Sequence, residues 1–214
     1  MIIVLLGPPA SGKGTLAQSL VEKEGWKSFS AGEALREAAK GNSKRAHEIR
    51  AYLKSGRLVP NAWVENLEEN FYRENRKKNM LLDGTPRNIA QALDMEKALK
   101  KGGLEFTAFL LFSTDKATSW KRIRSRSQCQ SCKRIYGLQL RPKKKGICNA
   151  CGGKLFHRND DSKKVLEARY RVYTKETLPL VEWAAQRYPV FYIDANRSPQ
   201  SALKQAKVAL GLLR

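Results

Sequence analysis

The stretch Gly7–Thr15, GPPASGKGT, contains the residue types that a phosphate-binding loop needs. Its glycines let successive backbone N–H groups turn toward phosphate oxygens, and the helix expected to follow adds partial positive charge. Lys13 can reach the outer phosphates as a point charge. The strict pattern has Ser or Thr directly after the lysine, whereas here Gly14 intervenes before Thr15. The stretch predicts a P-loop; the alternative is a Gly/Pro-rich turn with a solvated lysine.

All four cysteines of the chain lie in two CxxC pairs, Cys129/Cys132 and Cys148/Cys151, with fifteen residues between the pairs. This spacing is typical of a tetrahedral four-thiolate metal site, and four protein ligands leave no open position for catalysis. We therefore predict a structural zinc ion, with iron as the alternative that four thiolates also allow. Two disulfides or free thiols are the remaining interpretation.

An aspartate, Asp83, ends the apolar stretch NMLLDG. In an open α/β sheet, ligands bind beyond the carboxyl ends of the strands. Asp83 is therefore expected beside the P-loop if the two strands are neighbours, where it can hold Mg²⁺ directly or through water. The alternative is an aspartate that caps the turn before Gly84.

Arginines supply further candidate phosphate ligands. Arg87 follows the same strand closely, and five others attract notice: Arg36, Arg122, Arg126, Arg158 and Arg169. Each alone is typical of a solvated surface. A phosphoryl-transfer site needs several fixed cations, because charge spreads over the oxygens of the moving group, and the planar guanidinium suits this task.

The elements that would position these residues alternate along the chain. Apolar stretches predict strands at 1–6, 26–30, 79–84, 105–112 and 190–194. Helical spacing predicts helices at 12–24, 31–40, 43–54, 61–77, 89–101, 115–127, 161–187 and 199–213, with a kink or break near Pro179. Such alternation predicts an α/β fold, with a parallel sheet covered by helices on both faces.

Length and composition narrow the class of protein. The 214 residues suffice for one domain with an insertion. No apolar run approaches the roughly 18 residues of a membrane span, and the short run Met1–Leu6 is interpreted as a strand rather than a signal peptide, so we expect a cytoplasmic protein. Forty-one Lys and Arg against twenty Asp and Glu give a net charge of +21. This excess favours polyanionic partners such as nucleotides, RNA or acidic membrane surfaces. The alternative is that the proteins of the host are basic in general and the charge has no specific function.

Taken in order, these motifs resemble those of adenylate kinases of the kind that has a long, zinc-bearing lid. The similar segments are GPPASGKGT, FSAGEALR (29–36), GRLVP (56–60), LDGTPRNIAQA (82–92), RIRSR (122–126), the two CxxC pairs, RNDD (158–161), Arg169 and YTKETLPL (173–180). They cover nearly the whole chain. GKGT also occurs in that family's loop, so Gly14 fits the resemblance.

The resemblance implies a P-loop NTPase-type parallel sheet flanked by helices. The core would comprise residues 1–29, 61–125 and 162–214, with a helical insert for the nucleoside monophosphate at 30–60 and a small Cys₄ zinc lid at 126–161. It implies reversible transfer from Mg·ATP to AMP, giving two ADP. No covalent nucleophile is expected, because positioning and electrostatics perform this chemistry.

The resemblance also implies a role for each candidate residue. ATP would contact Gly7, Gly12, Lys13, Gly14, Thr15, Arg122 and Arg126, with Arg122 packed on its adenine. Lys13, Arg126, Arg158 and Arg169 would grip the transferred phosphoryl group, and Asp83 would anchor the Mg²⁺ water shell. The AMP site would comprise Ala31, Arg36, Val59, Gly84, Arg87, Gln91, Arg158 and Arg169, with Arg36 and Arg87 on its phosphate and Gln91 reading its adenine.

Three positions depart from the adenylate kinase pattern. Ala31 and Asn88 resemble the UMP/CMP kinases, and Thr85 replaces the usual aromatic residue. Gln91, which would contact the base itself, and the long lid favour AMP. We therefore predict an adenylate kinase, with a UMP/CMP kinase on the same scaffold as the alternative.

The lid segment is strongly basic: Lys121–Arg158 contains twelve Lys or Arg and no Asp or Glu. The resemblance implies that it closes over ATP and excludes water. A basic RNA-binding protein on a kinase scaffold is the competing interpretation. Aromatics for base stacking are sparse, with only Tyr136 and Phe156 between residues 127 and 158, which weakens that interpretation. We expect a monomer with, at most, nonspecific RNA association.

Overall fold

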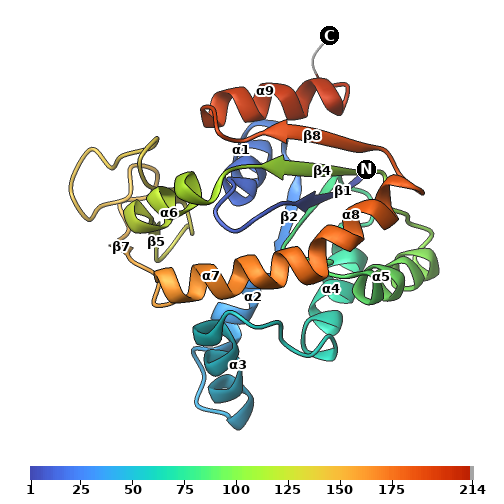
Figure 1. Ribbon diagram of the computed structural model, residues 1–214, viewed down its shortest axis with the longest axis horizontal. Helices are drawn as coiled ribbons and strands as arrows, with labels where there is room; N and C mark the ends of the chain where they lie inside the picture. The colour runs from blue at the N-terminus through green and yellow to red at the C-terminus, as the bar shows by residue number, and fades with distance from the viewer. Residues whose placement is uncertain (213–214) are drawn as a thin grey trace.

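Five short strands form the central sheet of the computed structural model, which describes residues 1–212 (Figure 1). They are β1 (Ile2–Leu6), β2 (Lys27–Ser30), β3 (Met80–Asp83), β4 (Ala108–Ser113) and β8 (Val190–Asp194). Their order is β2-β3-β1-β4-β8, and every neighbouring pair is parallel. All of β1 and nearly all of β3 and β4 are buried, because a parallel sheet covered on both faces requires apolar residues throughout each strand. The predicted α/β class is confirmed.

Helices cover the two faces of this sheet. On one face lie α1 (Lys13–Glu24) and α9 (Pro199–Ala209), whose buried residues pack with Ile3 and Leu5 of β1. The other face is covered by α4 (Ala62–Asn75), α5 (Ile89–Lys101) and α8 (Leu178–Ala185), which pack with the intervening residues of β1. Successive side chains of a strand point to opposite faces, so this one apolar run supports both layers.

One predicted helix is divided in the structure. Within the predicted helix over 161–187, the chain forms α7 (Lys163–Val172), a π-helical turn η1 (Tyr173–Thr177) and α8. The predicted break near Pro179 is confirmed, and the proline occupies the first turn of α8, where its missing N–H leaves no helical hydrogen bond unmade. Figure 1 shows the three segments running one after another across the front of the sheet.

Several predicted ends were also wrong by a few residues. β4 begins at Ala108 rather than at residue 105, and α6 (Lys116–Ser125) ends before residue 127. α9 ends at Ala209, and the predicted helix end at Leu213 lies outside the described residues.

Two excursions leave the sheet. The segment 30–60 forms α2 (Ala31–Ala38) and α3 (Lys44–Ser55), and the cysteine segment forms a small antiparallel sheet of order β6-β5-β7. Its strands are β5 (Ser127–Cys129), β6 (Ile135–Tyr136) and β7 (Leu155–Phe156). In Figure 1 the cysteine segment lies at the left, beyond α6, and α3 lies at the bottom. Within residues 1–212, no helix is long and apolar enough to cross a membrane.

Candidate active site

A cavity of about 920 Å³ opens at the carboxyl ends of the strands. The first residues after β1, β2, β3 and β8, namely Gly7, Ala31, Gly84 and Ala195, all line it, as expected for a ligand site in an open α/β sheet. All sixteen residues that the sequence analysis assigned to the nucleotide sites line this one cavity. So does Cys132, one of the four cysteines.

The P-loop has the expected strand–loop–helix setting, between β1 and α1. Gly7 is required there: its φ is +142°, and a Cβ would lie only 2.6 Å from the Phe112 carbonyl oxygen. The buried ammonium of Lys13 donates hydrogen bonds to the carbonyl oxygens of Gly7 (2.8 Å) and Pro8 (2.9 Å) and to Ser11 Oγ (3.1 Å). The loop thus curls around its own lysine.

Asp83 lies beside this loop because β1 and β3 are neighbours and Leu5 is paired with Asp83. A Cβ on Gly14 would lie 3.5 Å from Asp83 Oδ2, an ordinary contact distance, so the carboxylate lies against the first turn of α1. Burial lowers the pKa of Lys13 to about 8; Asp83 opposes this shift, and Arg87 and Arg126 add to it. The Lys13 ammonium therefore lies among two other cations, Arg87 and Arg126, and a single nearby carboxylate, Asp83.

Five arginines from distant parts of the chain surround the same space. Arg36 comes from α2, Arg87 from the turn after β3, Arg126 from the end of α6, Arg158 from the segment after β7 and Arg169 from α7. The fold therefore brings together cations that are up to 133 positions apart in the sequence.

Three carboxylates hold most of these arginines in place. Asp161 accepts two hydrogen bonds from Arg126, one of them from Nε at 2.8 Å. Glu33 Oε1 accepts from Arg36 and Arg158, both at 2.6 Å.

The third carboxylate, Asp160, bridges the insert and the core. It accepts from Arg169 and, at 3.3 Å, from Arg36 Nη1. Burial alone would raise the pKa of Asp160, but Arg169 and Arg36 hold it below its ordinary value. Arg87 differs from the other arginines: it donates through Nε to the Gly84 carbonyl oxygen at 3.0 Å and takes part in none of the ion pairs within the described chain.

Positive charge dominates the cluster. Lys13 and the five arginines face four carboxylates, Asp83, Glu33, Asp160 and Asp161, which leaves two uncompensated cations. Burial lowers the pKa of Arg87 and of Arg158 to about 10, and neighbouring arginines add to both shifts. Buried like charges repel strongly, so the arrangement favours a ligand that carries several negative charges.

Gln91 lies on the wall of the cavity formed by α4 and α5. Its Oε1 accepts from the Arg87 backbone N–H at 2.6 Å, and its Nε2 donates to Asn61 Oδ1 at 2.8 Å. Asn88 is the N-cap of α5, accepting from the Gln91 backbone N–H at 2.9 Å. This capping role accounts for Asn88 without reference to a pyrimidine base.

At the opposite end of the cavity, Arg122 spans two loops. It donates to the Ala195 carbonyl oxygen at 2.5 Å and to the Ala10 carbonyl oxygen at 3.5 Å. The amide of Gln139, from the cysteine segment, donates to the Arg197 carbonyl oxygen at 3.3 Å. The P-loop, the loop after β8 and the cysteine segment therefore enclose this end together.

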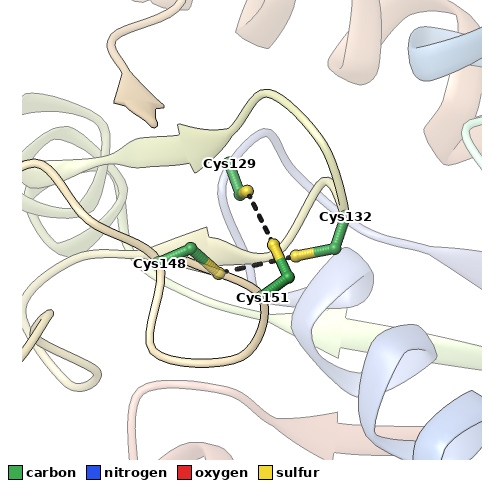
Figure 2. A group of neighbouring side chains, drawn as sticks. All are labelled: Cys129, Cys132, Cys148 and Cys151. Atoms are coloured by element: carbon green, nitrogen blue, oxygen red, sulfur yellow. Dashed lines mark hydrogen bonds between the residues drawn. The ribbon is translucent and has the colours of Figure 1, made fainter. Parts of the chain in front are cut away.

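The four cysteines converge on one point, as Figure 2 shows. Their sulfur atoms all lie within 4.8 Å of one another, with 3.5 Å between Cys129 and Cys151 and also between Cys132 and Cys148. A tetrahedron with Zn–S bonds of about 2.3 Å has sulfur–sulfur edges of about 3.8 Å, so the cluster fits a zinc ion closely. Cys129 and Cys148 are buried, whereas Cys132 and Cys151 are exposed.

The sequence analysis gave no role to Glu33, Asp160 or Asp161, although they organise the arginines. The adjacent pair Asp160–Asp161 next to Arg158 was a signal, because acids beside a phosphate-binding arginine are natural partners for it. Glu68 was also missed: it is a buried carboxyl group on α4 that lines the cavity, and nothing in the local sequence separates it from the exposed glutamates around it.

One basic cavity, with a P-loop at one end and a group of arginines at the other, is the arrangement of a P-loop kinase that acts between two nucleotides. The comparisons with known proteins narrow this class. The family model described as adenylate kinase matches residues 5–188, and the chain belongs to that family.

Curated relatives agree along nearly the full length. The chain is 37% identical to an adenylate kinase of Thermosipho melanesiensis over 207 residues, covering 96% of this chain and 97% of the relative. It is 36% identical to that of Fervidobacterium nodosum over 206 residues, 95% and 94% of the two chains. It is 36% identical to that of Orientia tsutsugamushi strain Boryong over 215 residues, 99% and 100%.

Proposed function

We infer that the protein catalyses reversible transfer of the terminal phosphoryl group of Mg·ATP to AMP, which gives two ADP. The observation that carries this inference is the buried excess of cations between the P-loop and Arg87. Two nucleotides that present their phosphates to each other across this cavity would supply the missing negative charge. Membership of the adenylate kinase family identifies the nucleotides as ATP and AMP.

In this proposal the donor occupies the P-loop end. Backbone N–H groups of Gly12, Gly14 and Thr15 at the start of α1 face its phosphates, and Lys13 exchanges loop carbonyl oxygens for phosphate oxygens. Asp83 would hold the water shell of the Mg²⁺ that enters with the donor, and that ion would neutralise part of the phosphate charge. Arg122 packs beside the donor base, near the loop after β8.

The acceptor occupies the end between α2, α4 and α5. Arg36 and Arg87 hold its phosphate, and Gln91 reads its base. Arg126, Arg158 and Arg169 then stabilise the charge that spreads over the moving phosphoryl group. Glu33, Asp160 and Asp161 hold these arginines in place before substrates arrive, so little reorganisation remains for the reaction itself.

The segments 30–60 and 126–161 close over the two nucleotides in this mechanism. Contacts between them support the proposal, since Arg158 of the lid donates to Glu33 of the insert at 2.6 Å. A zinc ion held by Cys129, Cys132, Cys148 and Cys151 would stabilise the lid without taking part in the chemistry. Closure excludes water, which would otherwise compete with AMP for the phosphoryl group.

A substrate panel tests the function. Mg·ATP is offered with AMP, UMP, CMP or GMP, and ADP formation is followed; turnover dominated by AMP is expected. Dominant turnover of UMP or CMP would instead make this a pyrimidine kinase, with Ala31 as the relevant departure. Lys13→Met should abolish turnover with every acceptor, whereas Lys23→Met, at an exposed site on the same helix, should not. Activity that survives Lys13→Met would show that the assigned site is wrong.

Other properties stay predictions. A net charge of +21 predicts weak, nonspecific RNA association that declines steeply with salt, which filter retention at several salt concentrations would measure. A monomeric state is expected from light scattering, and a cytoplasmic location from cell fractionation. RNA binding that resists salt and competes with ATP would contradict the nonspecific interpretation.

A further inference from the structure

Glu68 of α4 is a carboxyl group in an unexpected place. It is only 4% exposed, and it lines the cavity together with Thr85 and Met95, at the end where Gln91 lies. Its Oε1 accepts a 2.5 Å hydrogen bond from the Thr85 hydroxyl, and that hydroxyl is also 3.4 Å from Met95 Sδ. The residue therefore belongs to the wall of the acceptor end, although it also lines a smaller pocket between α4 and α5.

Stability does not explain this carboxyl group. Within the described chain, it takes part in none of the ion pairs, and its single recorded hydrogen bond is the one to Oε1. Burial raises the pKa of Glu68 to about 7, the Thr85 hydrogen bond opposes that shift, and Glu65 adds to it. The nearby Tyr72 hydroxyl is buried without a hydrogen-bond partner. A buried acid with an unused oxygen is unfavourable unless a ligand uses it.

The position of Glu68 in the cavity suggests which part of a ligand would contact its carboxyl group. Thr85 lies between Gly84 and Arg87 in the chain, and all three line the same cavity as Gln91. Both polar atoms of the Gln91 side chain already have partners, Arg87 N–H and Asn61. Within the described chain, Glu65 and Glu68 both line the cavity without an ion pair, and Glu68 is the buried one of the two, so it is a second candidate beside Gln91 for contact with the acceptor base.

We propose that Glu68, held by Thr85, is a specificity-determining residue that accepts a hydrogen bond from the exocyclic amino group at the 6-position of the acceptor purine. The proposal rests on the proposed function, because it assumes an acceptor base at this end of the cavity. An amino group offers N–H donors to the carboxylate. A 6-keto group would place its own oxygen against the carboxylate oxygen and leave both acceptors unpaired, so a 6-oxopurine is rejected.

The test compares AMP with inosine monophosphate, which carries a keto group at the position of the AMP amino group. The measured quantity is the ratio of kcat/KM for the two acceptors. Glu68→Gln offers an N–H donor in the same volume, so it should lower the AMP preference by about 10- to 100-fold, the range for one hydrogen bond to a charged group. Glu68→Leu removes the acceptor without adding a donor and should lower the preference less.

Glu69→Gln is the matched control, since Glu69 is an exposed neighbour on the same helix; its ratio should equal that of the unaltered enzyme. If a Glu68 variant loses turnover, calorimetric dissociation constants for the same two acceptors give the same comparison. An unchanged preference in both Glu68 variants overturns the proposal. Failure of the unaltered enzyme to use AMP would refute the proposed function instead, so the two failures are distinguishable.

Discussion

Replacing Glu68 by glutamine is expected to stabilise the folded chain more at pH 8 than at pH 5.5. The carboxyl group has a pKa of about 7 in the folded chain, raised by burial, against an ordinary value of 4.5. Between these values the folded state binds more protons than the unfolded state, so the free energy of unfolding decreases as the pH rises through this window. Below pH 4.5 both states are protonated, and the penalty disappears.

The magnitude follows from the two pKa values. At about 1.36 kcal/mol per pKa unit, the raised pKa of Glu68 costs about 3.3 kcal/mol of stability at pH 8 and about 1.4 kcal/mol at pH 5.5. Glutamine does not ionise, and the cost of burying its amide is the same at both pH values. The difference in free energy of unfolding between variant and unaltered protein should therefore increase by about 2 kcal/mol from pH 5.5 to pH 8.

Urea denaturation at the two pH values measures this difference, since the midpoint and slope give the free energy of unfolding. Every other titrating group contributes equally to both proteins and cancels. Glu69→Gln serves again as the control. The difference in free energy of unfolding between this variant and the unaltered protein should not vary with pH. A Glu68→Gln difference that is equal at the two pH values would show that Glu68 is charged in both states at no cost, and the account of its burial would be wrong.

Three further outcomes are expected. Triphosphate binding at pH 8.5 should take up a large part of one proton, because phosphate raises the lowered pKa of Lys13; calorimetry in buffers of different ionisation enthalpy measures this uptake, and no uptake would contradict it. Removing the metal with a chelator should expose the amides of β5 to β7 to hydrogen exchange while β1 and β3 stay protected; uniform exposure would contradict a separate lid. Glu33→Gln should weaken AMP binding a few-fold, because this carboxylate holds Arg36 and Arg158 in place; tighter binding in a titration would show that it chiefly competes with phosphate for them.

Much of the fold could be predicted because its signals are local. α5 and β8 have the predicted bounds, Ile89–Lys101 and Val190–Asp194, since a capping asparagine starts the former and an apolar run defines the latter. The P-loop is likewise a contiguous pattern. The strands β5, β6 and β7 gave no such signal, because two or three residues show no periodicity and their pairing depends on the cysteine cluster that joins their ends.

The site was predictable only in part, for a related reason. Cations that bind phosphate can be recognised by type and motif, but their carboxylate partners depend on tertiary contacts: Glu33 and Arg158 are 125 positions apart. The inward position of Glu68 is still harder to predict from the sequence. Glu68 stands among the glutamates of an amphipathic helix, where a charged residue is expected to be exposed, and only packing against Thr85 and Met95 shows that it points inward.

The cysteine cluster also explains how so basic a segment can fold. Its buried core contains only Cys129, Tyr136 and Cys148, with Leu155 packed against them, far too little apolar area to offset the entropy of ordering more than thirty residues. Four thiolates around one ion would replace that core, because metal binding contributes directly to folding. A lid stabilised in this way needs few apolar residues, so its sequence is free to carry lysines and arginines. In the proposed function, the metal that permits the fold of the lid would therefore also permit its charge, and that charge is what a segment closing over triphosphate requires.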